Sequence, residues 1–110
     1  DKIGHAEFRI GDSTVMIADE WPDMGALGPT SRGGITASFM IYVEDVDAAV
    51  RTAVNAGGTV DKPVENQFWG DRCGTVVDPF GHKWTLATHV EDVSPEEMQR
   101  RMEEWTGKQA

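Results

Sequence analysis

The sequence predicts an α+β protein whose second half follows the order strand, helix, strand, strand, strand. Three observations support this prediction. A short apolar run is followed directly by apolar residues at helical spacing, two β-rich segments come next, and the turn Asp78-Pro79-Phe80-Gly81 leads into a returning strand. Helices and strands repeat their side-chain directions at different periods, so the pattern of apolar residues distinguishes the two kinds of element.

The chain begins with a pattern typical of a β-hairpin. Residues 5–10, HAEFRI, alternate in polarity, Gly11-Asp12 supplies a two-residue turn, and the apolar segment STVMIA follows. Beyond it, the stretch from Trp21 to Gly34 is rich in glycine and proline, which predicts a connecting loop. We therefore expect residues 1–20 and 36–90 to be separated by a linker over 21–35.

The second half opens with TASFMIYV, residues 36–43, whose β-branched and aromatic side chains favour a strand. A helix is predicted directly after it. Asp45 is placed to cap its first turn, apolar residues recur every three or four positions, and Gly57-Gly58 ends it. The apolar stripe indicates that one face of this helix packs on a core.

Three further strands are predicted around the turn at Asp78. Residues 59–64 indicate an edge strand, because Pro63 has no N–H to donate to a neighbouring strand and is therefore tolerated at the edge of a sheet. Residues 73–77 and 83–88 indicate the other two. Asp78 itself is interpreted as turn chemistry, since an aspartate at the first turn position bonds back to the backbone.

A last helix is predicted over residues 94–106. Ser94 stands at the cap position, a proline follows at the first helical position, and Glu97 stands at the third, which is a capping-box pattern. Met98, Met102 and Trp105 fall on one face of this helix, and we expect that face to pack on the sheet or on a second subunit.

Composition excludes several classes of protein. The 110 residues suit a single domain, and no apolar run approaches the length that spans a membrane. A formal charge of -9 and a pI near 4.6 disfavour nucleic acid as a partner and favour a cationic ligand. The first residues lack a signal-peptide pattern and Cys73 is the sole cysteine, so a cytoplasmic protein is expected.

The predicted element order, the segment DPFGHKW and the FWGD that precedes it together resemble the vicinal-oxygen-chelate superfamily, and in particular its PhnB-like branch. Glyoxalases, bleomycin-resistance proteins and dioxygenases make up this superfamily. The resemblance runs from His5 to Met102 and includes HAEFRIGDSTVMIADE, YVEDVDAAV and PVENQFWGDRCG. It implies a single domain with the paired βαβββ modules of the glyoxalase/bleomycin resistance fold, curled around one cavity, and a homodimer.

The resemblance also implies a first module that is incomplete at the N-terminus. Residues 1–20 correspond to the end of module one, and residues 36–90 to the whole of module two. Either the preceding strand and helix lie outside the numbered chain, or a partner subunit completes the fold. An uncovered sheet edge would otherwise invite association.

The superfamily's metal is not expected in this chain. The resemblance places Met16, Ser38 and Thr85 where metal-dependent members carry carboxylate or imidazole ligands, and none of these three suits a hard divalent ion. No cofactor is therefore predicted.

Candidate site residues fall into two groups. His5 and Glu7 are candidates for acid–base catalysis, with a surface histidine as the plainer interpretation of His5. A ligand-binding cavity lined by apolar and aromatic side chains, with one arginine close by, is the main prediction. Its predicted members are Met16, Met40, Tyr42, Phe68, Trp69 and Arg72.

Two positions of the segment FWGDR leave alternatives open. Arg72 is suited to grip a carboxylate or to stack on a ring, or else to form a salt bridge with Asp71 or Glu65. The missing side chain of Gly70 allows the close approach of a ligand or of another part of the chain.

Together these features predict a metal-free small-molecule-binding protein that sequesters a cationic or aromatic ligand. One alternative is a lyase, isomerase or dioxygenase that uses a metal or acid–base residues. Another is a structural or assembly protein with a vestigial cavity. Resemblance of fold does not choose among these functions.

Overall fold

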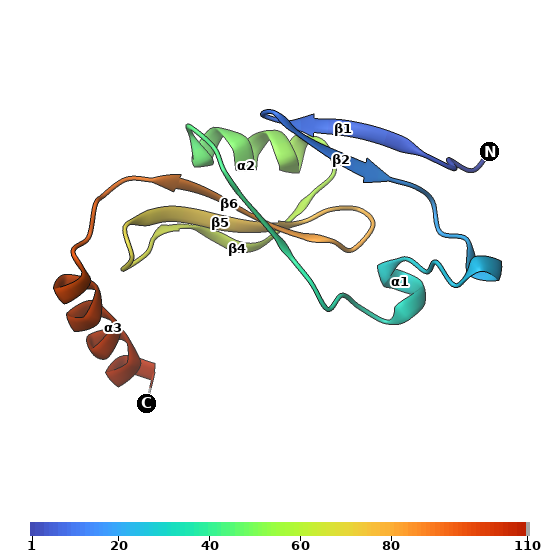
Figure 1. Ribbon diagram of the computed structural model, residues 1–110. Coiled ribbons are helices and arrows are strands. Elements are labelled where there is room, and N and C mark those ends of the chain that lie inside the picture. Colours follow the sequence, from blue (N-terminus) through green and yellow to red (C-terminus); the bar gives the residue numbers. More distant parts are fainter. Residues whose placement is uncertain (110) are drawn as a thin grey trace. The chain divides into compact units, whose positions relative to one another are not determined.

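The computed structural model describes residues 1–109, which form two compact units (Figure 1). The first unit is Asp1–Gly34, and the second begins at Ile35. No helix within residues 1–109 is long and apolar enough to cross a membrane.

The first unit contains the predicted hairpin. Strands β1 (Ala6–Ile10) and β2 (Ser13–Ile17) pair in antiparallel register across the turn, where Gly11 has a φ of 61°. Two short helical turns, η1 (Pro22–Met24) and α1 (Pro29–Arg32), lie in the segment predicted as a loop. Each begins with a proline, which suits the first helical position because its missing N–H needs no partner there.

The second unit confirms the predicted βαβββ order. Strand β6 pairs in parallel with β3 and antiparallel with β5, which also pairs with β4, so the sheet order is β3-β6-β5-β4. Figure 1 labels the last three of these strands. This is the glyoxalase-like α+β arrangement that the sequence predicted. Its elements are β3 (Phe39–Tyr42), α2 (Val46–Asn55), β4 (Thr59–Asn66), β5 (Asp71–Val77), β6 (Lys83–His89) and α3 (Pro95–Gln109).

Three elements differ in length from the prediction. Strand β3 is shorter than residues 36–43, whereas α3 continues beyond residue 106. Strand β4 continues through Pro63 to Asn66, with register shifts against β5 between Val60 and Lys62 and again between Lys62 and Glu65. The edge position and these irregularities explain how a strand tolerates a proline that cannot donate to a ladder.

Helix α2 covers one face of the sheet and creates the core there. Val46 and Val50 of the helix are buried against Val76 of β5 and Leu86 of β6. The Asp45 carboxylate accepts a hydrogen bond from the backbone N–H of Ala48, which confirms the predicted cap. Burying an apolar stripe in this way supplies most of a helix's stability.

Thr88 ties the start of α2 to the sheet. Its hydroxyl accepts a hydrogen bond from the backbone N–H of Val46 at 2.9 Å and donates one to the carbonyl of Val43 at 2.9 Å. One of the helix's unpaired N–H groups is thus satisfied by a β6 side chain. The helix therefore begins at a defined point above β3 and β6.

Gly70 ends the tight connection between β4 and β5, and the chain itself makes the close approach there. Gly70 is buried with a φ of 99°, and its carbonyl accepts hydrogen bonds from the N–H groups of Val90 and Glu91. A Cβ at this position would overlap the carbonyl oxygen of Glu91. Only glycine meets both requirements without strain.

Replacing Gly70 with alanine should therefore destabilise the fold by about 1–3 kcal/mol, the usual cost of one strained backbone conformation. Urea unfolding followed by circular dichroism measures the change. Gly107 is the matched control, because it lies in α3 with open space around it, and Gly107→Ala should not lower the unfolding midpoint. Equal stability of the Gly70→Ala variant and the unmodified protein would contradict this assignment.

Candidate functional site

The sheet face opposite α2 carries the exposed side chains that suit ligand contact. Because side chains alternate along a strand, Met40 and Tyr42 of β3 lie on the other face from Ile41, which packs on the core. Tyr42 is 62% exposed. The same face carries alternate residues of β5 and β6, namely Asp71, Cys73, Thr75, Thr85, Ala87 and His89.

Asp71 is the buried polar centre of this face. It is only 2% exposed, and its carboxylate accepts hydrogen bonds from the Tyr42 hydroxyl at 2.7 Å and from Nε1 of Trp69 at 3.1 Å. The Nδ1 atom of His89 lies 3.1 Å from its other oxygen. Burial opposes ionisation of Asp71, but the bonds from Tyr42, His89 and Trp69 outweigh it and hold the pKa below its usual value.

His89 lies between two carboxylates. Its Nδ1 faces Asp71, and its Nε2 lies 2.7 Å from Asp92, whose side chain is fully exposed. The bonds to Asp92 and then to Asp71 raise the pKa of His89 above its ordinary value. Tyr42 is shifted in the same direction, because donating its proton to Asp71 raises the pKa of the phenol.

Aromatic residues border this group on one side. The rings of Phe68 and Trp69 meet edge to face at 5.0 Å, and Phe68 lies 5.8 Å from the ring of Trp105 on α3. Arg101 of α3 binds the Glu91 carboxylate through two nitrogens and donates a third bond to the carbonyl of Phe68. The helix is thus fastened to the turn that carries the two aromatic residues.

A broad hollow opens beside Tyr42 and His89. Its other lining residues are Val43, Glu44 and Thr88, which lie at the ends of β3 and β6. Tyr42 contributes an exposed ring, while Glu44 and His89 contribute titratable groups. The hollow therefore combines an aromatic surface with charge, the combination that orients small ligands.

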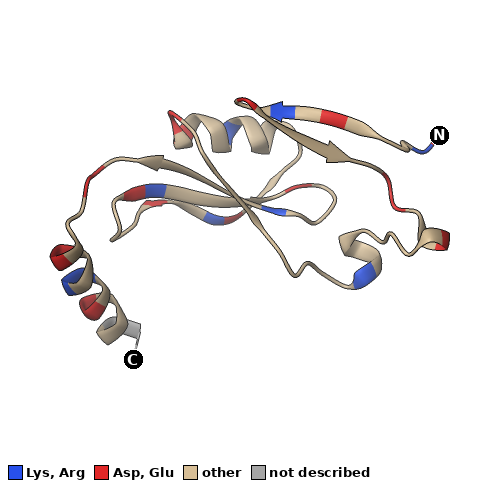
Figure 2. Cartoon of the chain, in the orientation of Figure 1, with Lys and Arg blue, Asp and Glu red and all other residues tan. Residues whose placement is uncertain are grey.

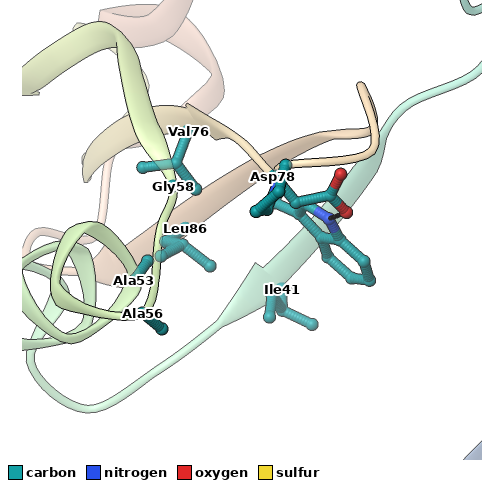
Figure 3. A pocket seen from close by; sticks show the side chains of 9 residues that line it. Ile41, Ala53, Ala56, Gly58, Val76, Asp78 and Leu86 are labelled. Atoms are coloured by element: carbon teal, nitrogen blue, oxygen red, sulfur yellow. Dashed lines mark hydrogen bonds between the residues drawn. The ribbon is translucent and has the colours of Figure 1, made fainter. Parts of the chain in front are cut away.

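A second, apolar pocket lies on the other side of the sheet, next to α2 (Figure 3). It has a volume of about 270 Å³ and is lined mostly by aliphatic side chains such as Ile41 and Leu86. Of its polar groups, the Asp78 carboxylate accepts a bond from Nε1 of Trp84 at 3.0 Å. Asp78 also accepts bonds from two backbone N–H groups of its own turn. This pocket has few polar groups left to orient a ligand.

The structure brings some predicted site residues together and separates others. Met40, Tyr42 and Trp69 belong to the face around Asp71, with Phe68 adjoining Trp69. Arg72 lies on the helix-covered face, because it alternates with Asp71.

Arg72 forms a salt bridge with neither of the partners considered from sequence. Its Nε and Nη2 atoms bind the two carboxylate oxygens of Asp47 on α2 at 2.9 and 3.1 Å, and Nη1 donates to Asn66. This bidentate pair lowers the pKa of Asp47 and connects the helix to β5. Arg72 is thus committed to a structural contact.

Other predicted residues lie in or before the hairpin of the first unit. Met16 is an exposed residue of β2. Nε2 of His5 lies 2.7 Å from the carboxylate of Glu7, and both side chains are about half exposed. An exposed pair of this kind contributes little to stability and has no buried partner to orient it.

Two of the positions assigned to metal ligands lie in the second unit. Ser38 precedes β3, and the Thr85 hydroxyl lies 3.0 Å from that of Thr75 on the open face. Residues 1–109 contain no group of three or more His, Cys, Asp or Glu side chains arranged to hold a metal ion.

Sequence reasoning missed the contact between Asp71 and His89, although a signal for it was present. The turn that begins at Asp78 sets the register of β5 and β6, in which Val77 lies opposite Lys83. Counting back six residues on one strand and forward six on the other pairs Asp71 with His89. Residues opposite each other have side chains on the same face.

The charged residues of the second unit are mixed on α3 but mainly acidic near the hollow. Figure 2 shows acidic and basic residues interspersed along α3, where Arg100 and Arg101 both pair with Glu97. Glu44 lines the hollow, and His89, which also lines it, is paired with the carboxylates of Asp71 and Asp92. The rim of the hollow therefore contributes to the net negative charge of -9.

The four-stranded sheet, its parallel β3 and β6 and the single helix between β3 and β4 define the class of βαβββ proteins. Within this class the chain belongs to the Glyoxalase/Bleomycin resistance protein/Dioxygenase superfamily, whose family model matches residues 1–86. This confirms the superfamily that DPFGHKW and FWGD indicated.

The chain is similar to proteins of mycobacteria and of Pseudomonas. It is 45% identical over 104 residues to the uncharacterized proteins Mb0911c of Mycobacterium bovis and Rv0887c of Mycobacterium tuberculosis. The alignments cover 92% of this chain, but 68% and 61% of the two relatives. The crystal structure of PA1353 from Pseudomonas aeruginosa superposes with a TM-score of 0.60 at 29% identity, covering 83% of this chain and 66% of that one.

Asp71→Asn should destabilise the protein by about 2 kcal/mol at neutral pH, because hydrogen bonds to a buried carboxylate are among the stronger ones. The folded pKa of Asp71 lies below its ordinary 3.8, so its ionised form stabilises the fold above that value. This stability is lost as the pH falls through the lower, folded pKa.

Urea unfolding at several pH values measures both effects. The difference between Asp71→Asn and the unmodified protein should shrink once acid protonates Asp71. Asp92→Asn is the control, since the exposed Asp92 should change the unfolding free energy little. A difference that stays constant into acid would assign the loss to packing.

Proposed function

We propose that this chain forms part of a small-molecule-binding protein that holds an aromatic, cationic ligand on the open face of its sheet. The observation that supports this most directly is the exposed ring of Tyr42, whose hydroxyl is fixed by the buried Asp71. An exposed aromatic ring held in one orientation presents a flat surface with little conformational entropy left to lose on binding.

The surroundings of Tyr42 support the same proposal. Met40, on the same strand face, is 49% exposed and supplies an adaptable apolar surface. Trp69 is bonded to the same carboxylate as Tyr42, and Phe68 packs against it. These four residues form the proposed binding face, and we assign Arg72 to the fold instead.

The charge of the protein favours a cationic ligand. The net charge of -9 and the acidic rim beside Tyr42 attract positive charge and repel anions. An aromatic face also attracts a cation directly, an interaction worth about 0.5–2 kcal/mol. Capture of a cationic drug or metabolite, without chemical change, is the function that these features support best.

The proposal extends to five finer expectations. We infer membership of the PhnB-like branch, a homodimer in the cytoplasm, no metal cofactor, and a stoichiometric role of the kind that the bleomycin-resistance name denotes. The wording of FWGD and DPFGHKW supports the branch. The occupation of two metal positions in this unit by Ser38 and Thr85 supports a metal-free site.

Tyr42→Ala should weaken binding of acridine orange, a planar cationic dye, by roughly tenfold, because it removes the stacking surface. Fluorescence titration of the intact protein measures the dissociation constant. Tyr42→Phe should have an intermediate affinity, since the ring remains but loses the bond to Asp71 that fixes its orientation.

Two matched variants control for general effects. Phe80 is another exposed aromatic residue, in the turn after β5, and Phe80→Ala should bind the dye as the unmodified protein does. Arg72→Gln should also leave affinity unchanged, because Arg72 lies on the helix-covered face. Unchanged affinity in Tyr42→Ala, or loss in Phe80→Ala, would place the site elsewhere.

A further inference from the structure

The hollow beside Tyr42 contains a positive group of its own. When protonated, His89 donates from Nδ1 to the buried Asp71 and from Nε2 to the exposed Asp92. In that state the imidazolium is paired with both of these carboxylates. A ligand cation that reaches the hollow therefore meets carboxylates that already have a positive partner.

We propose that this hollow is the subsite for the ligand's cationic group, and that this group competes there with the proton on His89. The inference rests on the proposed function, because it assumes that the ligand stacks on Tyr42. Beyond that function, the inference states where the cationic group of the ligand binds and that the affinity for the ligand depends on pH.

The two carboxylates explain how the exchange works. Water can take the place of the histidine at the exposed Asp92 but not at the buried Asp71, so we infer that neutral His89 keeps its proton on Nδ1 and its bond to Asp71. Neutral imidazole has its only N–H on Nδ1 in this arrangement, and Nε2 then carries a lone pair. Asp92 loses its donor and becomes available to a ligand's ammonium group.

Two other titratable groups line the hollow beside His89. Glu44 lines the hollow after β3, and Tyr42 on β3 is neutral. Glu91, two residues along the chain, is bound by Arg101 of α3 and is therefore already paired. A bound cation and an imidazolium would repel each other across this rim, which lowers the affinity of either for the site when the other is present.

The sign of the pH dependence follows from the pKa of His89, which lies above the ordinary 6.5 in the free protein. Above that pKa the histidine is neutral, and the ligand binds with full affinity. Below it, only the neutral fraction binds the ligand, so the apparent dissociation constant should rise up to about tenfold per pH unit. Binding in the transition range should release up to one proton.

Acridine orange, which stays cationic through this range, is the probe. Fluorescence titrations between about pH 5.5 and 8.5 give the dissociation constant over the range in which histidines titrate. Calorimetry in two buffers with different ionisation heats counts the protons released. The intact protein should bind more tightly as the pH rises, and His89→Gln should bind with nearly the same affinity at every pH.

Two variants make the test specific. His5→Gln removes the other exposed histidine that contacts a carboxylate, and it should keep the full pH dependence. Asp92→Asn should weaken binding above the His89 pKa, because the ligand loses its acceptor.

Each failure has a distinct meaning. Absence of dye binding at all pH values would overturn the proposed function. Dye binding that does not change with pH would overturn the proposed competition with His89 but not the proposed function. A His89→Gln variant that keeps the pH dependence would have the same meaning.

Discussion

The carboxylate of Asp71 lies almost entirely out of contact with water, and its charge is stabilised by donors from three separate parts of the chain. Tyr42 comes from β3, Trp69 from the turn before β5, and His89 from the end of β6. A buried carboxylate without such donors would cost several kcal/mol. The same bonds that keep Asp71 ionised hold the three donors, which the proposed ligand contacts, in fixed positions.

The two faces of the sheet have separate tasks. On the helix-covered face, the apolar cluster, Thr88 and the pair of Arg72 with Asp47 hold α2 in place. On the open face, large side chains such as Met40 and Tyr42 remain exposed. Strand alternation makes this division possible, because one strand contributes to the core and to the proposed binding face at once.

The fold could be predicted from sequence because its signals are local. Asp45 caps a helix and Asp78 organises a turn with partners only a few residues away. Arg72 shows the limit, since its partner Asp47 lies 25 residues away and no local pattern connects them. The resemblance predicted Tyr42 and Trp69 as aromatic residues of a cavity. Asp71, which joins them, entered the prediction only as a partner for Arg72.

The turn between β5 and β6 lies far from Asp71 and His89, although it connects the two strands that carry them. None of its residues lies at the hollow, yet its length sets Asp71 opposite His89 six pairs away. A slip of β6 by one residue against β5 would carry the imidazole to the helix-covered face, while a slip by two would return it to the open face opposite a different neighbour. Relatives in which β6 has a different register against β5 should therefore carry other residues at the positions of Asp71 and His89.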